Sequence, residues 1–409
     1  MYSRRCLRIY RETVVNNSSE SSPLVDSVNV KPKLIIVGEC NVQLWSITPA
    51  ERHRRSFARV GVTGDANEND ETSGAIVAVR ADYLLGPDLI TAIATRSNTV
   101  LTTADGNVAV AANVTADDLE CGLDLLRATT LDGARTSASR FDFLGPAELG
   151  SAYDDTLRKR ATPFVLSYRD TAIDVLEAKT FGAAYKGATD FVTKWCWPRP
   201  ARAVTRWAAA RGISPNSITT VSLVLVLVAL WLFSEGHFLS AIPIAWAMTF
   251  LDTVDGKLAR VTVTSSAWGN IYDHGIDLIH PPFWWYGWYL GVLPVASATV
   301  ASSLELALWV ILGGYLVGRL VEGLFVLCFK IESHIWQPVD YFFRTITARR
   351  NPNLAILTLA TCLGRPDVGF VCVALWTVIC LAFHAIRLVQ AVIIHRRGGR
   401  IESWLNPQN

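Results

Sequence analysis

The pattern of apolar and polar positions divides the chain into two halves of different character. In the first half, apolar residues come in short runs that alternate with helical patterns. Strand-like runs begin at Leu34 (LIIVG) and cover 74–79 and 107–114, and helical patterns cover 87–95 and 116–128. Alternation of buried strands with amphipathic helices is typical of α/β domains. The sequence therefore predicts an N-terminal soluble α/β domain over residues 33–165.

The second half contains much longer apolar segments, rich in Trp, Leu and Val. They cover approximately 217–233, 239–258, 267–293, 303–327, 352–364 and 367–393. A helix that spans a bilayer needs about 20 apolar residues. The segment 352–364 is short for this, so we expect its helix to start in the preceding residues. The pattern predicts a multi-pass α-helical membrane bundle of about six transmembrane helices over residues 214–395.

The remaining segments connect or flank these two domains. Residues 1–32 contain a Ser/Asn-rich stretch and are expected to be a disordered linker, and residues 396–409 to be a cytosolic tail. Residues 166–213 are expected to hold a linker and an amphipathic helix, because Trp and Arg side chains interleave just before the first apolar segment. Such a helix suits a membrane surface, although an ordinary surface helix would show the same pattern.

Composition supports a membrane protein and excludes little else. Of the 409 residues, 51% are hydrophobic and 18% are charged, against about 25% charged in soluble proteins. The net charge of +2 gives no reason to expect a nucleic-acid partner. The eight cysteines form no CxxC pair, so we expect them to be buried thiols in a reducing compartment.

The positions of Lys and Arg predict the orientation in the membrane. They precede the first predicted helix, lie between the second and third and between the fourth and fifth, and follow the sixth; the opposite connections 234–238 and 294–302 contain neither, and the last contains only Arg365. Cytoplasmic loops carry an excess of Lys and Arg. We therefore expect both termini and the α/β domain to be cytosolic, in a protein that is integral to the bacterial inner membrane.

Residues 252–277 (DTVDGKLARVTVTSSAWGNIYDHGID) hold the candidate chemistry. Four positions on the first helix and three on the next are each spaced to share one helix face. They are Asp252, Asp255, Gly256 and Ala259, and then Gly269, Asp273 and Asp277. Two neighbouring helices would thus present four carboxylates beside three residues with almost no side chain.

Four carboxylates in or near a membrane are costly without compensation, and Arg260 alone cannot neutralise them. Divalent cations can, because Mg²⁺ takes oxygen ligands and bridges carboxylates to phosphate oxygens. Two such ions can stabilise both the attacking and the leaving oxygen of a displacement. The small residues would leave room for a nucleotide, and Arg260 could pair with a phosphate.

The spacing DxxDGxxAR, eight residues, then GxxxDxxxD resembles the signature of the CDP-alcohol phosphotransferase (CDP-alcohol phosphatidyltransferase) family. The eight matching positions are Asp252, Asp255, Gly256, Ala259, Arg260, Gly269, Asp273 and Asp277. A motif of this kind needs its structural context, and about six membrane helices supply it. The resemblance extends over approximately residues 186–395.

This resemblance implies a CDP-linked donor, a hydroxyl acceptor and release of CMP. It also implies two divalent cations (Mg²⁺ or Mn²⁺) bound by Asp252, Asp255, Asp273 and Asp277, with Asp277 also the catalytic general base, and a homodimer in the lipid bilayer. The residues expected to contact the donor are Asn216, Thr219, Gly256, Ala259, Arg260, Ser266 and Gly269. The acceptor stays open among inositol phosphate, glycerol phosphate, another polyol and an amino alcohol, and the donor between CDP-diacylglycerol and a soluble CDP-alcohol.

The N-terminal domain resembles a degenerate nucleotidyltransferase. An active one needs a Gly-rich loop after the first strand to bind phosphates, but here that loop, GECNVQLW, has one Gly. We therefore expect a non-catalytic domain, with Asp82 either a relic metal ligand or a solvated residue at a strand end. The alternatives are a bifunctional cytidylyltransferase and CDP-alcohol phosphotransferase, or, in another class, a membrane transporter or inactive scaffold.

Weaker signals surround the motif. His274 and His280 are more typical of packing residues than of residues with a role beside the acids. The aromatic cluster at 277–291 is more typical of helix packing and a membrane-interface belt than of a surface that stacks on substrate. A group of basic residues could bind an acceptor phosphate or simply face lipid headgroups. It comprises Arg319, Lys330, Arg344, Arg349 and Arg350.

Overall fold

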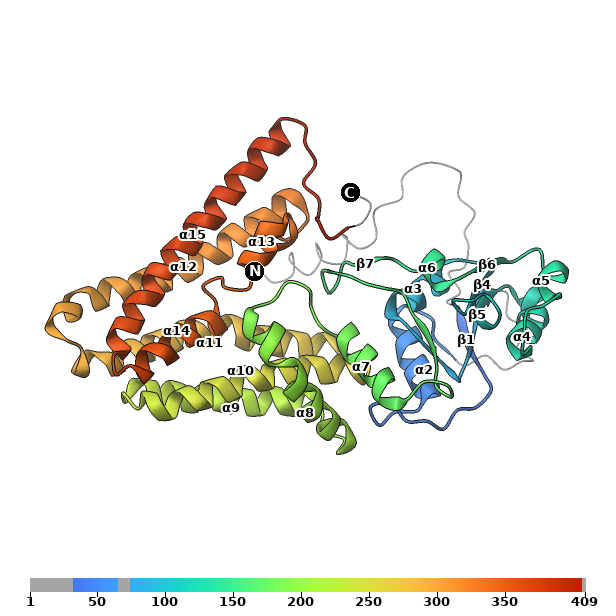
Figure 1. Cartoon of the computed structure of the whole chain (residues 1–409), viewed down its shortest axis with the longest axis horizontal. Coiled ribbons are helices and arrows are strands. Elements are labelled where there is room, and N and C mark those ends of the chain that lie inside the picture. Colours follow the sequence, from blue (N-terminus) through green and yellow to red (C-terminus); the bar gives the residue numbers. More distant parts are fainter. Residues whose placement is uncertain (1–31, 65–73, 407–409) are drawn as a thin grey trace, which may run out of the picture.

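The computed structural model describes residues 32–64 and 74–406. The described chain forms an α/β domain, at the right of Figure 1, and a helical domain, at the left. Both predicted domains are therefore present. The predicted disordered segment 1–32 lies outside the described residues except for Pro32, as does the end of the predicted tail.

The α/β domain is built on a five-stranded mixed sheet. Its strands are β1 (Lys33–Val37), β2 (Ile76–Arg80), β4 (Thr99–Thr102), β5 (Ala109–Val114) and β6 (Asp142–Leu144), in the order β1-β2-β5-β4-β6. The pairs β1–β2 and β4–β6 are parallel, and β5 is antiparallel to both its neighbours. Every residue of β5 is buried, as expected of a strand in the middle of a covered sheet.

Helices cover both faces of this sheet. On one face, α4 (Leu119–Arg127) buries Leu123 and Leu126 against Ile76. On the other face lie α2 (Pro49–Arg59) and α3 (Pro87–Thr95), which bury Phe57 and Ile93. The α2 helix starts with its N-cap Thr48, whose Oγ1 accepts the Glu51 N–H at 3.3 Å. The predicted strands and helices of this domain are confirmed, while α2 and β4 were not predicted.

Several short elements complete the α/β domain. They are β3 (Tyr83–Leu85) paired with β9 (Val165–Ser167), β7 (Tyr153–Asp154) paired with β8 (Lys159–Arg160), and the helices α5 (Ala134–Ser137) and α6 (Pro146–Leu149). Two to four residues are too few to leave a clear hydrophobic period in the sequence.

The helical domain contains a helix at each of the six predicted positions. They are α9 (Pro215–Ser234), α10 (Phe238–Val261), α11 (Ala267–Val292), α12 (Ala298–Phe329), α14 (Arg350–Cys362) and α15 (Pro366–Arg396). A short helix, α13 (Pro338–Phe343), lies between α12 and α14. In Figure 1, α9 and α10 run side by side, and α12 and α15 form a second long pair.

Four of these helices are long and apolar enough to cross a membrane: α9, α10, α12 and α15. The prediction of about six spans is not confirmed. The α14 helix has 13 residues, about 20 Å at 1.5 Å per residue, which is short of a hydrocarbon layer of about 30 Å. The α11 helix has 26 residues but contains Asp273, Asp277 and two prolines.

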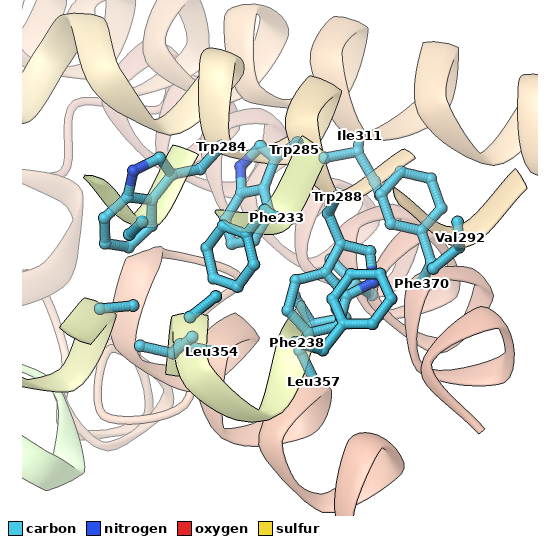
Figure 2. Packing of buried hydrophobic residues seen from close by; sticks show 14 of the residues in the cluster. Phe233, Phe238, Trp284, Trp285, Trp288, Val292, Ile311, Leu354, Leu357 and Phe370 are labelled. Atoms are coloured by element: carbon cyan, nitrogen blue, oxygen red, sulfur yellow. The ribbon is translucent and has the colours of Figure 1, made fainter. Parts of the chain in front are cut away.

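Aromatic packing joins the helices of this domain (Figure 2). Trp284 and Trp288 of α11 are fully buried and contact Phe233 of α9 with ring centroids 5.8 and 4.9 Å apart. Trp288 also lies 4.7 Å from the ring of Phe238, at the start of α10. Offset and tilted aromatic pairs of this kind stabilise a core beyond their buried area. The aromatic cluster is thus helix packing, as the sequence favoured, and it fixes α11 beside α9 and α10.

Two helices link the domains, α7 (Ile173–Ala183) and α8 (Pro198–Ala210). Trp195 and Trp207, the first before α8 and the second on it, are exposed, as a membrane-surface helix requires. Trp197 instead packs inward, 5.1 Å from the ring of Phe250. Arg206 forms ion pairs with carboxylates of α7, which leaves fewer cations on α8 for lipid headgroups than the sequence suggested.

Candidate active site

Three carboxylates meet where the C-terminal half of α10 passes the start of α11. Asp252, Asp273 and Asp277 each offer an oxygen, and these atoms lie within 4.8 Å of one another. The helices bring them together because Asp252 lies on α10 near its C-terminal end, while Asp273 and Asp277 are one turn apart on one face of α11. Sequence spacing predicted both faces, and the fold makes them face each other.

Asp255, the fourth predicted ligand, is not in that group of three. It is buried, and its Oδ2 accepts the hydroxyl of Thr219 at 2.6 Å. Its Oδ1 accepts the N–H of Gly256 at 2.5 Å. Thr219 comes from the first turns of α9, so three helices contribute to the site.

Arg350 provides the positive charge beside the acids. Its Nη1 lies 2.5 Å from Asp277 Oδ1, and its Nη2 lies 2.5 Å from Asp252 Oδ2. Among the described residues it is the sole Lys or Arg that forms an ion pair with any of the three acids. The sequence offered Arg350 as an acceptor-phosphate contact, and no spacing connects it to acids 73 and 98 positions away.

The residues present fit divalent cations. Three ionised carboxylates with one guanidinium leave an excess of negative charge in a partly buried place, which is costly near a membrane. Carboxylate oxygens at this mutual distance are the ligands that Mg²⁺ and Mn²⁺ prefer. The same three positions could therefore bind metal if Arg350 moved or shared them.

A cavity of about 450 Å³ opens beside the acids. Asp255 and Asp273 line it together with six of the seven predicted donor contacts: Asn216, Thr219, Gly256, Ala259, Ser266 and Gly269. A side chain at position 269 would have its Cβ 2.9 Å from Asn216 Oδ1 and 3.1 Å from Ser266 Oγ, so a larger residue would require the Asn216 side chain to move. The small residues predicted from the sequence thus form part of the wall of this cavity.

The helix α11 begins at this cavity. Ser266 is its N-cap, and Ser266 Oγ accepts the N–H of Gly269 at 3.0 Å. The remaining first-turn N–H groups and the helix dipole favour a negative group in front of them. Carboxylates for cations and a helix N-terminus for anions therefore lie on one cavity, as a phosphate–metal complex requires.

Comparison with known proteins agrees with this geometry. Residues 212–348 match the sequence profile of the CDP-alcohol phosphatidyltransferase family. This part of the chain is therefore similar to CDP-alcohol phosphatidyltransferases, and the helical domain that contains it is called the transferase domain below. All four predicted metal ligands and all seven predicted donor contacts lie inside the matched range, and enzymes of this family are generally dependent on divalent metals.

Two curated relatives are similar over part of this transferase domain. Cholinephosphotransferase 1 of Danio rerio is 31% identical over 120 residues, which are 26% of this chain and 30% of the relative. Archaetidylinositol phosphate synthase of Pyrococcus horikoshii is 32% identical over 96 residues, 23% of this chain and 50% of the relative. The chain thus spans half or less of the relatives it matches. The family match does not include residues 33–165, so their likeness to nucleotidyltransferases stays a prediction.

The two basic residues of the motif contact the segment that precedes α8. Arg260 Nε donates to the carbonyl of Ala184 at 2.9 Å, and Lys257 Nζ lies 3.9 Å from the ring centre of Tyr185. Arg260 does not line the cavity, in contrast to the other predicted donor contacts. Burial raises the pKa of Tyr185 to about 12, so its phenol stays protonated at neutral pH.

The other basic residues proposed for an acceptor phosphate are largely engaged. Arg319 and Arg349 both pair with Glu322, at 3.1 and 2.5 Å. Arg344 Nη1 is buried without a hydrogen-bond partner among the described residues. Burial, reinforced by the charge of Arg349, lowers the pKa of Arg344 to about 9. Lys330 ends α12 in a left-handed conformation.

The two histidines near the motif differ in their surroundings. His280 is 4% exposed, its Nδ1 is 2.7 Å from the carbonyl of Ile276, and its ring packs edge-on against Trp284. His274 is exposed, with Nδ1 3.0 Å from the carbonyl of Asn270. Packing therefore accounts for His280, but the packing role that the sequence favoured for His274 is wrong, because its side chain is exposed.

Proposed function

We propose that the protein transfers a substituted phosphate group from a CDP-alcohol to a hydroxyl acceptor and releases CMP, in phospholipid biosynthesis. One observation carries this proposal. Three carboxylates inside the range that matches the family, two of them paired with Arg350, lie beside a nucleotide-sized cavity. A cavity of about 450 Å³ lies within the usual range for small-molecule sites, roughly 300–1,000 Å³.

Asp252, Asp255, Asp273 and Asp277 would hold two divalent cations. Bound there, the cations would neutralise the donor phosphates and stabilise charge on the attacking and leaving oxygens. Thr219 fixes the carboxylate of Asp255 by its hydrogen bond. Arg350 would keep Asp252 and Asp277 paired whenever the cations are absent.

The reaction is a displacement at the phosphorus that carries the donor alcohol. The acceptor oxygen forms a new bond to this phosphorus, and the bond from phosphorus to the oxygen bridging to CMP breaks. Asp277 takes the proton of the acceptor hydroxyl, and CMP leaves with the bridging oxygen. Asp277 suits this role because its side chain is 41% exposed, more open to an acceptor than Asp252 at 16%.

Donor binding would use the cavity. The small residues Gly256, Ala259 and Gly269 let the nucleotide approach the helix backbones. Asn216 and Ser266 offer polar groups to the donor. Arg260 would have to leave the carbonyl of Ala184 to contact the donor.

The substrates belong to one of two classes. One relative is named for cholinephosphate transfer and the other for archaetidylinositol phosphate synthesis. We therefore propose a CDP-linked lipid or head group as donor and leave the alcohol to be identified by assay.

We further propose that the site faces the cytosol of a bacterial inner membrane and that the protein is a homodimer. The orientation is supported by the Lys and Arg residues that precede α9 and lie between α10 and α11. The acids lie on the two helices that this second connection joins. The dimer rests on the family resemblance.

CMP release tests the function. The purified, detergent-solubilised protein is incubated with CDP-diacylglycerol, Mg²⁺ or Mn²⁺ and a panel of hydroxyl acceptors, and then with soluble CDP-alcohols. We expect CMP release that one acceptor stimulates and that EDTA or Asp277→Asn abolishes. Folded protein that releases no CMP from any donor would contradict the proposal and favour a transporter or an inactive scaffold.

A further inference from the structure

The α/β domain forms part of the wall of the donor cavity. Four of the lining residues come from this domain: Trp45, Ser46, Ile47 and Arg55. They are far in sequence from the transferase domain and outside the range that matches the family. The sequence predicted a non-catalytic domain with a structural role, and nothing in that prediction placed it at the site.

Three arginines of α2 fix this contact. Arg52 Nη2 donates to the carbonyl of Val261 at 2.6 Å, Arg55 Nη1 to Thr262 at 3.0 Å, and Arg59 Nη2 to Ser265 at 3.3 Å. The three lie at i, i+3 and i+7, on one face of α2. Their acceptors are carbonyls at and just after the end of α10, where the helix has unpaired carbonyls and a partial negative charge.

A shared apolar core makes the contact rigid. Leu44 and Trp45 are buried in one cluster with Val254, Leu258 and Val261 of α10. The loop that carries Ser266 is thus held between α10 and the α/β domain. A domain joined in this way cannot move without disturbing the cavity wall.

The turn at Trp45 and Ser46 is strained and firmly held. Both residues have positive φ, 56° and 61°, between the bridged residues Leu44 and Ile47. Non-glycine residues in this region cost about 1 kcal/mol or more each. The turn persists because Trp45 is buried and its Nε1 donates to Thr180 Oγ1 at 2.8 Å. Strain maintained in this way presents the exposed Ser46 at the cavity.

Arg55 has capacity left for a ligand. Its Nε pairs with Glu51 at 2.6 Å and its Nη1 with Thr262, while no described residue is recorded as a partner of its Nη2. A guanidinium has five N–H donors. Its side chain is 32% exposed, so a molecule in the cavity can reach it.

The positions of two cavity-lining residues along α10 indicate which end of the donor lies beside Arg55. Asp255 and Thr262 both line the cavity, and seven residues correspond to about 10 Å along a helix. Phosphates belong at the acid end, where cations would bind. The nucleoside end then extends toward Thr262 and the α/β domain.

We propose that Arg55 and the Trp45–Ser46 turn bind the nucleoside end of the CDP donor, so that the α/β domain is a donor-specificity element of the enzyme. This inference rests on the proposed function. It explains why the domain is fused to the transferase without requiring it to catalyse a reaction of its own.

CMP binding, measured by calorimetry on the full-length protein with Mg²⁺, separates the two proposals because it needs no turnover. We expect Arg55→Ala to weaken CMP binding about tenfold, the effect of losing roughly one charged hydrogen bond. The donor KM should rise by a similar factor, with kcat changed less than about threefold, because the contact is equal in ground and transition states.

Two further variants make the test specific. Ser46→Tyr leaves the Arg55–Thr262 hydrogen bond in place and fills the cavity mouth, so it should also weaken CMP binding. Arg54→Ala removes the same charge from α2 at a residue that does not line the cavity and should bind CMP like the wild type. Wild-type CMP affinity in both Arg55→Ala and Ser46→Tyr would overturn the inference and leave the function standing. A wild-type protein that binds no CMP would overturn both.

Discussion

Carboxylates in the two domains are compensated in opposite ways. In the α/β domain, Asp82 pairs with Arg80 at 2.8 Å and lies 3.5 Å from Arg169, so two cations serve one acid. In the transferase domain, one cation, Arg350, pairs with both Asp252 and Asp277, and no Lys or Arg among the described residues forms an ion pair with Asp273.

This difference separates a structural acid from a functional one. The side chain of Asp82 is 13% exposed, so it is not the solvated strand-end residue that the sequence suggested, and its charge is balanced by two arginines. Proximity to Arg80 and Arg169 lowers the pKa of Asp82 despite its partial burial. The transferase acids have an unmet charge, and unmet charge is what a cation would bind. The count of local countercharges, rather than the residue type, distinguishes the two sites.

The largest expected effect comes from removing an acid in each domain. Asp277→Asn should reduce CMP release by about 1,000-fold, because it removes the general base and a metal ligand. Asp82→Asn should leave the activity of the folded protein within about twofold while lowering its stability by roughly 1–3 kcal/mol, since its arginines lose their partner. Initial rates of CMP release measure the activity of the two variants, and melting curves measure their stability. Equal loss of activity would remove the distinction between the acids.

Removing Arg350 tests whether the acids of the transferase domain lack enough positive charge beside them. Arg350→Ala leaves three acids without a countercharge and should destabilise the metal-free protein by about 3 kcal/mol. Mn²⁺ should then raise its melting temperature more than that of the wild type, because the ion restores the missing charge.

The neighbouring residue gives the matched control. Arg349 pairs with Glu322 instead of the motif acids, so Arg349→Ala should be destabilised to the same extent with and without Mn²⁺. A similar Mn²⁺ response in both variants would show that Arg350 has no special relation to the metal site.

A smaller effect is expected at the hydrogen bond that orients Asp255. Thr219→Val keeps the side-chain shape and removes the 2.6 Å bond to Asp255 Oδ2. Loss of such a supporting contact typically costs 10–100-fold in metal affinity or activity, so the Mn²⁺ concentration at half-maximal rate should rise by about tenfold. Thr219→Ser keeps the hydroxyl and should stay near the wild type. An unchanged Mn²⁺ dependence in Thr219→Val would exclude Asp255 as a ligand.

The smallest effect concerns a group that the α/β domain keeps uncharged. Burial lowers the pKa of His53 to about 4, opposed by a hydrogen bond to the carbonyl of Tyr83. The unfolded chain takes up the proton below about pH 6.5 and the folded chain only below about 4, so stability falls as the pH drops through this range. Between pH 7 and 5.5 the loss should be roughly 1 kcal/mol. Melting curves of the wild type should show this contribution, and the loss of stability between pH 7 and 5.5 should be smaller by this amount in His53→Gln.

Sequence reasoning was strongest where a pattern repeats over many residues. The ends of α9 to α12 and α15 lie within about five residues of their predicted positions because each has a long apolar run. The motif spacing placed acids and glycines on facing helices, and six of the seven predicted donor contacts line one cavity.

The sequence was weakest where a contact joins distant segments. Arg350 reaches Asp252 across 98 positions, and Arg55 reaches Thr262 across 207. Arg260 matched the family motif, yet it donates to Ala184, because the connection before α8 folds over the end of α10. Single-chain periodicity carries no information about such pairings, since they arise only when segments far apart in the sequence pack against each other.

Mn²⁺ titration of metal-free protein, with bound Mn²⁺ and CMP release measured on the same samples, tests the central claim most directly. The account predicts that both rise together and saturate near two ions per chain, and that Asp273→Asn reduces both. CMP release that persists in full after metal removal, or Mn²⁺ binding that Asp273→Asn leaves unchanged, would contradict the claim that these acids form the metal site of the transferase.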